Sequence, residues 1–155
     1  MRYIFVGFIL LFAGCSIKNY EQIDAKIIII KSPQLKFADL GYVRHNDKDI
    51  ELELFVAGQV VKKISINHLI CVDEGCMLKG SFNKEYLHAS YPDDILQNII
   101  LGRKIYAGEN SLKIADGFRQ AIKRKDVDID YSVTSKVISF KDKKNRIIFK
   151  IKDTK

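Results

Sequence analysis

The strongest constraint on the fold is an alternation of apolar and polar side chains with a period of two residues. The clearest example is the segment 49–56, where four aliphatic residues alternate with two glutamates (Ile50, Leu52, Leu54 and Val56 with Glu51 and Glu53). The segment 127–134 repeats the pattern. Because successive side chains of a strand point to opposite faces, each segment can bury one face and expose the other. The chain is therefore predicted to be rich in β-sheet.

Further strands are predicted where short apolar segments are separated by turn residues. These segments cover residues 26–31, 35–43, 60–66, 104–107, 111–115, 118–123, 136–141 and 146–152. Pro33 marks a bend between the first two segments, and the polar run 142–145 forms a hairpin loop before the last one. Strands that follow one another so closely in the chain are expected to pair as antiparallel hairpins.

The middle of the chain changes to a helical period. Ser81 is placed to cap a short helix over residues 81–89, and Pro92-Asp93-Asp94 suits the first turn of a second one. Gly102 stands where the residue after that second helix adopts a left-handed conformation. One face of the second helix is predicted to be fully aliphatic (Ile95, Leu96, Ile99 and Ile100).

Together these patterns predict a mainly β (α+β) fold of nine to eleven short strands. The expected architecture is a curled antiparallel sheet or half-barrel, with the two short helices inserted between two β-meanders and tucked into the curl. Such an arrangement either fills its core or keeps an apolar cavity between sheet and helices. In the second case the lining residues are expected to be Leu52, Leu54, Ile95, Leu96, Ile99 and Ile100.

Two cysteines, Cys71 and Cys76, flank a polar Asp73-Glu74-Gly75 turn. They fall at opposite positions of a predicted hairpin, which favours a disulfide that fixes its register. A redox pair is the alternative, although the C-x4-C spacing differs from C-x-x-C. A zinc site would need further ligands, and the histidines His45, His68 and His88 are not spaced for one. No metal site is predicted.

The N-terminal segment MRYIFVGFILLFAGC has a basic start, an apolar run and a small-residue pair before Cys15. The apolar run, residues 3–12, is too short to cross a bilayer as a helix. Phe12-Ala13-Gly14-Cys15 resembles the lipobox of bacterial lipoproteins. The resemblance implies that residues 1–14 are a signal peptide and that Cys15 is lipidated. Residues 15–22 would then form a tether and residues 23–155 a single β-rich domain.

The same resemblance implies a location. Ser16 follows the cysteine, where lipoproteins held in the inner membrane carry Asp, so the chain is expected in the outer membrane, anchored by lipid and facing the periplasm. The formal net charge of +7 is compatible with anionic headgroups or nucleic acid. Export argues against nucleic acid as a partner, so the membrane is the expected one.

The order of the predicted elements resembles one group of lipoproteins. A lipobox, a meander, a helical segment with Tyr91-Pro92-Asp93-Asp94-Ile95-Leu96 leading to Gly102, and a second meander look like the LolA/LolB-like outer-membrane lipoproteins. Those proteins are curled sheets that hold the acyl chains of lipoproteins in an apolar cavity. The resemblance implies a fold and a lipid or acyl ligand, and it assigns no functional residue.

No catalytic residue and no cofactor are predicted, because the motifs of hydrolases, metalloproteases and nucleotide-binding enzymes are missing. Asp73-Glu74 and Asp93-Asp94 are explained by a turn and a helix start. The basic runs 119–125 and 141–146 read as solvated surface, with anionic headgroups as the alternative partner. Two functions remain: binding or carrying a lipid, or an accessory role in which the chain docks another cell-envelope protein through edge strands or basic loops.

Overall fold

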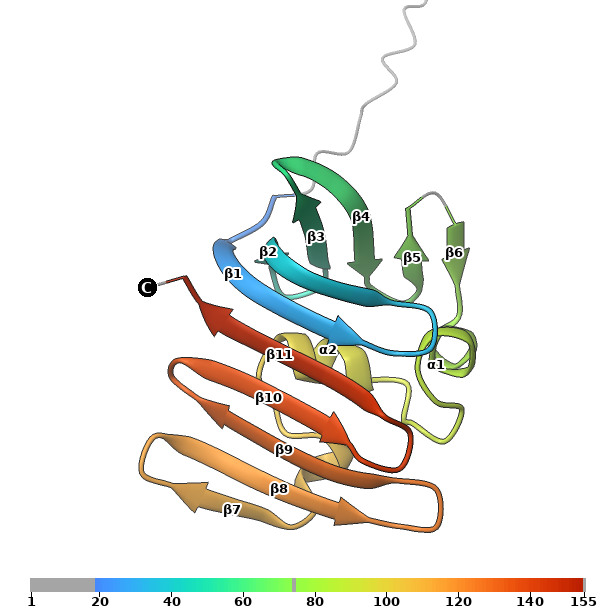
Figure 1. Cartoon of the computed structure of the whole chain (residues 1–155), viewed down its shortest axis with the longest axis vertical. Coiled ribbons are helices and arrows are strands. Elements are labelled where there is room, and N and C mark those ends of the chain that lie inside the picture. Colours follow the sequence, from blue (N-terminus) through green and yellow to red (C-terminus); the bar gives the residue numbers. More distant parts are fainter. Residues whose placement is uncertain (1–18, 74, 155) are drawn as a thin grey trace, which may run out of the picture.

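The computed structural model describes residues 19–73 and 75–154. These residues form eleven strands, two short α-helices and one 3-10 turn (Figure 1). The predicted signal peptide, residues 1–14, and the predicted lipidation site Cys15 lie outside the described residues. The fold is mainly β, as predicted from the alternation of apolar and polar side chains.

The strands and helices follow the chain in a simple order. The first six strands are β1 (Gln22–Lys31), β2 (Lys36–His45), β3 (Ile50–Val56), β4 (Gln59–Ile66), β5 (Ile70–Val72) and β6 (Gly75–Met77). The helices α1 (Lys79–Tyr86) and α2 (Ile95–Ile100) and the 3-10 turn η1 (Tyr106–Gly108) come next. The last five strands are β7 (Ser111–Ile114), β8 (Gly117–Lys123), β9 (Asp128–Thr134), β10 (Val137–Asp142) and β11 (Ile147–Asp153).

All eleven strands belong to one antiparallel sheet with the order β6-β5-β4-β3-β2-β1-β11-β10-β9-β8-β7. The first and last strands of the chain pair at its centre, where Ile28 lies opposite Ile151. The sheet is not closed, so β6 and β7 are its two edges. Residues 78–110, which hold both helices, therefore connect opposite edges of the sheet.

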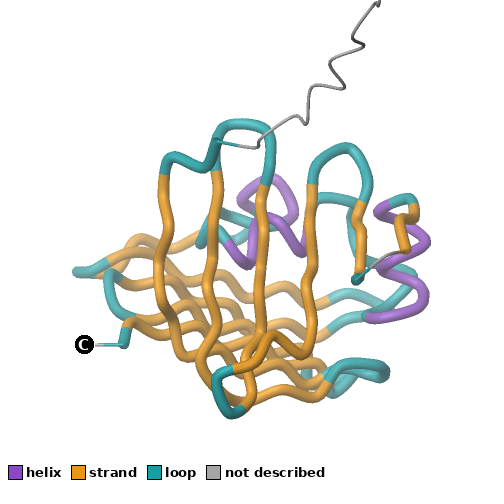
Figure 2. The backbone as a smooth tube through the Cα atoms, turned by 90° about the horizontal axis from the view of Figure 1, so that it is seen from above, coloured by secondary structure: helices purple, strands orange, loops and turns teal. Residues whose placement is uncertain are grey.

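The sheet curls, and both helices lie on its concave side (Figures 1 and 2). Gly41 on β2 occupies a position in the sheet that has no room for a side chain. A Cβ atom at this position would lie 2.5 Å from Cδ1 of Ile28 and 2.8 Å from the carbonyl oxygen of Glu53. Since neither distance is tolerated by real side chains, only glycine lets the neighbouring strands β1 and β3 approach so closely here.

The concave side carries the hydrophobic core. In β3, Leu52 and Leu54 are each 1% exposed, and in β9 Tyr131 is fully buried. Four aromatic rings form a group in the core. Phe140 is its central ring and contacts Tyr91, Tyr131 and Phe149 at centroid distances of 6.0 to 6.1 Å. The buried residues of sheet and helices make one cluster. As the period-two pattern predicts, one face of each strand contributes to a single core.

Glu51 departs from this pattern because it is only 7% exposed although it faces the convex side. Its carboxylate contacts Lys63 at 2.7 Å and Arg44 at 3.1 Å, and it accepts a hydrogen bond from the Tyr20 hydroxyl at 3.0 Å. Burial alone would raise the pKa of Glu51, but these donors outweigh it and lower that pKa below its usual value. The cross-strand charges therefore compensate the burial.

Two local predictions were wrong. Ser81 does not cap the first helix but lies inside it, because α1 already begins at Lys79 and Phe82 N–H donates to the carbonyl of Leu78 at 2.9 Å. Residues 104–107 do not form a strand. The buried side-chain amide of Gln120 accepts a hydrogen bond from the N–H of Ile105 at 2.9 Å and donates one to the carbonyl of Ile105 at 3.0 Å. These two bonds satisfy backbone groups that would otherwise pair with a neighbouring strand.

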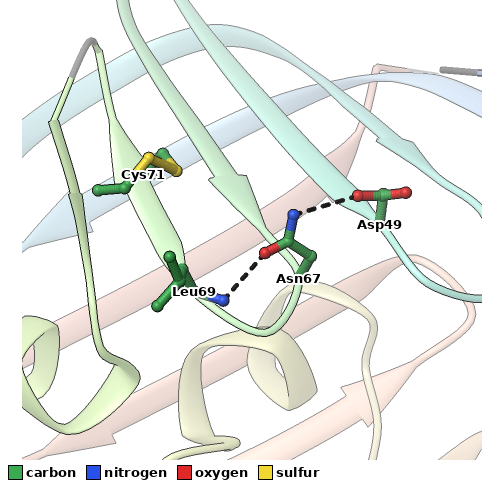
Figure 3. The surroundings of a disulfide bond; sticks show 5 residues. Asp49, Asn67, Leu69 and Cys71 are labelled. Atoms are coloured by element: carbon green, nitrogen blue, oxygen red, sulfur yellow. Dashed lines mark hydrogen bonds between the residues drawn. A yellow bond between two sulfur atoms is a disulfide. The ribbon is translucent and has the colours of Figure 1, made fainter. Parts of the chain in front are cut away.

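The predicted disulfide between Cys71 and Cys76 is present and joins β5 to β6. The preceding turn is held by Asn67, whose amide contacts Asp49 at 3.5 Å and accepts the Leu69 N–H at 2.9 Å (Figure 3). The hairpin ends at an edge of the sheet, where β6 has only one neighbour. The disulfide thus holds β6, an edge strand of three residues that pairs only with β5 in the sheet.

Replacing both cysteines by serine should lower the free energy of unfolding by about 2 kcal/mol, because so short a loop removes little entropy from the unfolded chain. Urea denaturation of the oxidised protein and of the Cys71→Ser/Cys76→Ser variant measures the difference. The wild type under reducing conditions is the matched control and should behave like the variant. A loss above about 4 kcal/mol would contradict a local role for the bond.

Candidate functional site

The C-terminal end of α2 is fastened to the concave face of the sheet. The hydroxyl of Tyr131 on β9 donates to the carbonyl of Arg103 at 2.9 Å and approaches that of Asn98 at 3.3 Å. Burial raises the pKa of Tyr131, so this hydroxyl stays protonated and can donate at any ordinary pH. Tyr131 therefore fastens the segment that follows α2, at Arg103, and also reaches the Asn98 carbonyl within the helix.

Gly102 brings the chain after α2 close to the sheet. Its φ is +63°, as predicted for the residue that ends this helix. A Cβ atom here would lie 3.2 Å from side-chain atoms of Ile138 and of Val133. The absence of a side chain thus allows close contact with β9 and β10 in addition to the left-handed conformation.

A second anchor holds the segment that leads into α2. The hydroxyl of Tyr91 donates to the fully buried carboxylate of Asp142 at 2.7 Å. The amide of Asn83, also fully buried, donates to the carbonyl of Pro92 at 2.9 Å. Burial by itself would raise the pKa of Asp142, but hydrogen bonds from Tyr91, Asn145 and backbone N–H groups lower it below its usual value. Asp142 therefore stays ionised as an acceptor.

Beside the C-terminal end of α2, at one end of the sheet, lies an open cleft, named here the α2 cleft. Its volume is about 300 Å³, at the low end of the range of small-molecule sites. The apolar residues that line it come from β2, α2 and its C-terminus, β10 and β11 (Val43, Ile100, Leu101, Ile138 and Ile151). Val43, Ile100 and Ile151 are at most 5% exposed, so the cleft borders directly on the core.

The rim of the α2 cleft is charged. Its charged residues lie on β1, after α2, in the β9–β10 turn and at the end of β11 (Asp24, Lys26, Arg103, Lys136 and Asp153). Lys26 contacts both acidic groups, Asp153 at 2.6 Å and Asp24 at 3.9 Å. Arg103 and Lys136 are exposed and have no ion-pair partner within the described part of the chain. The lining of the cleft is therefore partly apolar, and its polar part includes two cations without an ion-pair partner in the described part of the chain.

The six residues predicted to line a lipid cavity all lie in the core and are at most 3% exposed (Leu52, Leu54, Ile95, Leu96, Ile99 and Ile100). The structure brings them into one cluster, with the helical four on α2 and the other two on β3. Ile100 also lines the α2 cleft, whereas the other five do not. The aliphatic face predicted for α2 is thus buried, and Ile100 at the C-terminal end of this helix borders the α2 cleft.

Asp73 and Asp94, one residue from each predicted acidic pair, serve local structure. Asp73 accepts from Lys62 at 2.8 Å and from the backbone N–H of Lys63 at 3.1 Å, which lowers its pKa. Asp94 accepts from the Asn98 amide at 2.8 Å, one turn further along α2.

The histidines are dispersed: His45 lines the α2 cleft, and His88 lies 2.7 Å from the hydroxyl of Ser90. In the described ranges, no three His, Cys, Asp or Glu side chains are grouped to hold a metal. No residue of the basic runs 119–125 and 141–146 lines the α2 cleft, and within them Lys143 and Arg124 are paired with Asp130 and Glu109.

Sequence reasoning missed Arg103, Lys136 and the inward-facing polar end of β1. Arg103 follows a helix and Lys136 sits in a hairpin turn, where single basic residues are common and carry no pattern. The start of β1 has an apolar Ile23 between polar residues, and only the pairing of β1 with β11 brings it beside Asp153. No local signal could have placed them in one cleft.

No protein-family model, curated protein or solved structure matches the chain. With eight and six residues, α1 and α2 are far shorter than the length needed to cross a bilayer, and no other described helix is long enough either.

Proposed function

We propose that the chain is an outer-membrane lipoprotein, anchored through Cys15 and facing the periplasm, that binds or carries a lipid by its acyl chain. The observation that carries the proposal is the α2 cleft, which opens at the border of the core and is lined by aliphatic side chains of α2 and the sheet. The lipobox-like segment before Cys15 supports the anchor. The half-barrel with helices inside the curl, as in LolA/LolB-like proteins, is part of the same proposal.

Acyl binding is favoured by the chemistry of the lining. The aliphatic side chains of Leu101 and Ile138 line the open cleft, and an acyl chain lying against them would be removed from water. Each methylene removed from water contributes about 0.8 kcal/mol. An acyl chain gains this free energy for each methylene that it lays against the aliphatic part of the lining.

The proposal is tested by native mass spectrometry of the form beginning at Ser16, purified under mild conditions, with organic extraction of bound material. A stoichiometric phospholipid or other acyl species is expected. Ile138→Trp, which fills the α2 cleft, should remove it, because the larger ring occupies the space that the chain needs. Leu112→Trp is the matched control, since Leu112 is 69% exposed on the edge strand β7, and it should retain the lipid.

A clean protein mass with no bound lipid would contradict this proposal. It would favour the alternative, an accessory lipoprotein that docks another cell-envelope protein. The feature favouring that alternative is the edge strand β7, which exposes Leu112 and Ile114 and has an unpaired backbone edge.

A further inference from the structure

We infer that the α2 cleft takes an acyl ligand with an anionic head group, a carboxylate or a phosphate, held by Arg103 and Lys136. The inference rests on the proposed function and names the ligand class of the same site. It combines two properties of one cleft, the aliphatic lining and the excess of positive charge on the rim.

The charges at the rim are not balanced. Lys26 is positioned between the two acidic groups and contacts both, so its charge is already compensated. In the described residues, the Arg103 guanidinium and the Lys136 ammonium have no such partner, although both line the cleft. An incoming anion would therefore meet two unpaired cations, whereas the two carboxylates that a cationic head group could meet, Asp24 and Asp153, already share Lys26.

The backbone around Arg103 is held in place before any ligand arrives. Its carbonyl accepts from Tyr131, and its N–H donates to the carbonyl of Asn98 at 2.8 Å. Lys136 lies in the β9–β10 turn, where the Thr134 hydroxyl accepts from the N–H of Val137 at 3.1 Å. Both cations thus extend from fixed backbone, which lowers the ordering cost of binding.

The lining and the cations are adjacent. Arg103 directly follows Gly102, where an added Cβ atom would lie 3.2 Å from Ile138, and Lys136 lies two residues before Ile138. A chain lying against Ile138 would place a head group at its end beside these two side chains. The arrangement suits an amphiphile better than a free inorganic anion, which would gain nothing from the aliphatic lining.

The test uses the full chain held in amphipol, with displacement of a fluorescent fatty acid followed by anisotropy. The competitors are dodecanoate, dodecyl phosphate and dodecanol, which share one chain and differ in head group. For the wild type, at least one of the two anions should bind roughly ten- to thirty-fold more tightly than dodecanol. The tighter anion distinguishes a fatty acid from a phosphate-bearing lipid.

The variant Arg103→Gln/Lys136→Gln should lose this preference while keeping the affinity for dodecanol, which also shows that it is folded. Lys113→Gln/Lys123→Gln is the matched control, because it removes two exposed lysines that do not line the cleft, and it should keep the preference. Equal binding of anions and dodecanol by the wild type would overturn the inference and leave the proposed function standing. No binding of the fluorescent fatty acid would overturn both.

Discussion

Replacing Asp142 by alanine should lower the free energy of unfolding by about 3 to 5 kcal/mol, because a buried donor left without an acceptor costs about 1 to 3 kcal/mol. The Asp142 carboxylate is fully buried and accepts from the Tyr91 hydroxyl and the Asn145 amide, both at 2.7 Å. It also accepts from the backbone N–H groups of Asp128, Lys144 and Asn145 at 3.0 to 3.2 Å. Alanine would leave all of these donors unsatisfied at once.

The measurement is urea denaturation monitored by circular dichroism at neutral pH. Asp142→Asn is the informative second variant, because it keeps an acceptor oxygen and removes the charge, and it should lose less stability than Asp142→Ala. The matched control is Asp116→Ala, which removes an exposed carboxylate bonded to Ser135 on the outside of the molecule. A loss below about 1 kcal/mol for Asp142→Ala would show that this carboxylate does not hold the segment before α2.

The same residue predicts a pH dependence. The folded-state pKa of Asp142 is lowered, so its contribution is fully present above the unfolded-state value of about 3.9 and is lost as the pH falls through the folded-state value. The difference in stability between the wild type and Asp142→Asn should therefore be constant near neutral pH and shrink below about pH 4. A constant difference down to the acid limit would contradict the assigned direction.

Replacing Phe140 by alanine should cost about 3 to 5 kcal/mol, the usual cost of removing a large aromatic ring from a core. Phe140 is fully buried and contacts the rings of Tyr91, Tyr131 and Phe149. These rings come from β9, β11 and the segment before α2, so the side chain joins the helical insert to the sheet. The cavity left by alanine can collapse little, because the strands around it are fixed by their hydrogen bonds.

Denaturant unfolding of Phe140→Ala and of Leu112→Ala measures this effect against a matched large-to-small change at the surface. Leu112 is 69% exposed, and its replacement should change stability by no more than about 0.5 kcal/mol. A similarly small loss of stability for Phe140→Ala would mean that the core around Phe140 is not tightly packed. Phe140→Leu should fall between the two alanine variants, since it keeps most of the buried volume.

Much of the secondary structure could be predicted because its cause is local. The alternation in residues 49–56 corresponds to β3, and the aliphatic face of α2 is buried as expected. The Cys71–Cys76 pair follows from two apolar segments around a polar turn. In each case the residues that determine the structure lie within a few positions of one another.

The failures have a common cause in distant partners. Residues 104–107 have the composition of a strand, but the Gln120 side chain, fifteen positions away, satisfies the backbone of Ile105. The first helix begins before Ser81 because Leu78 already accepts its first hydrogen bond. Glu51 and Asp142 are buried although both are acidic, since their donors come from other strands and loops. None of these partners is visible in the local pattern.

By itself the sequence determined most of the segments that form strands, the apolar face of these strands and of α2, and where the hairpin disulfide closes. These properties depend on the period of the side chains and on turn residues, which act over short distances. Only the tertiary structure decided that β1 pairs with β11, because such a pairing joins segments more than a hundred residues apart. That pairing brings Asp24 and Lys26 to Asp153, and the packing of α2 adds Arg103 and Ile100 to the same cleft.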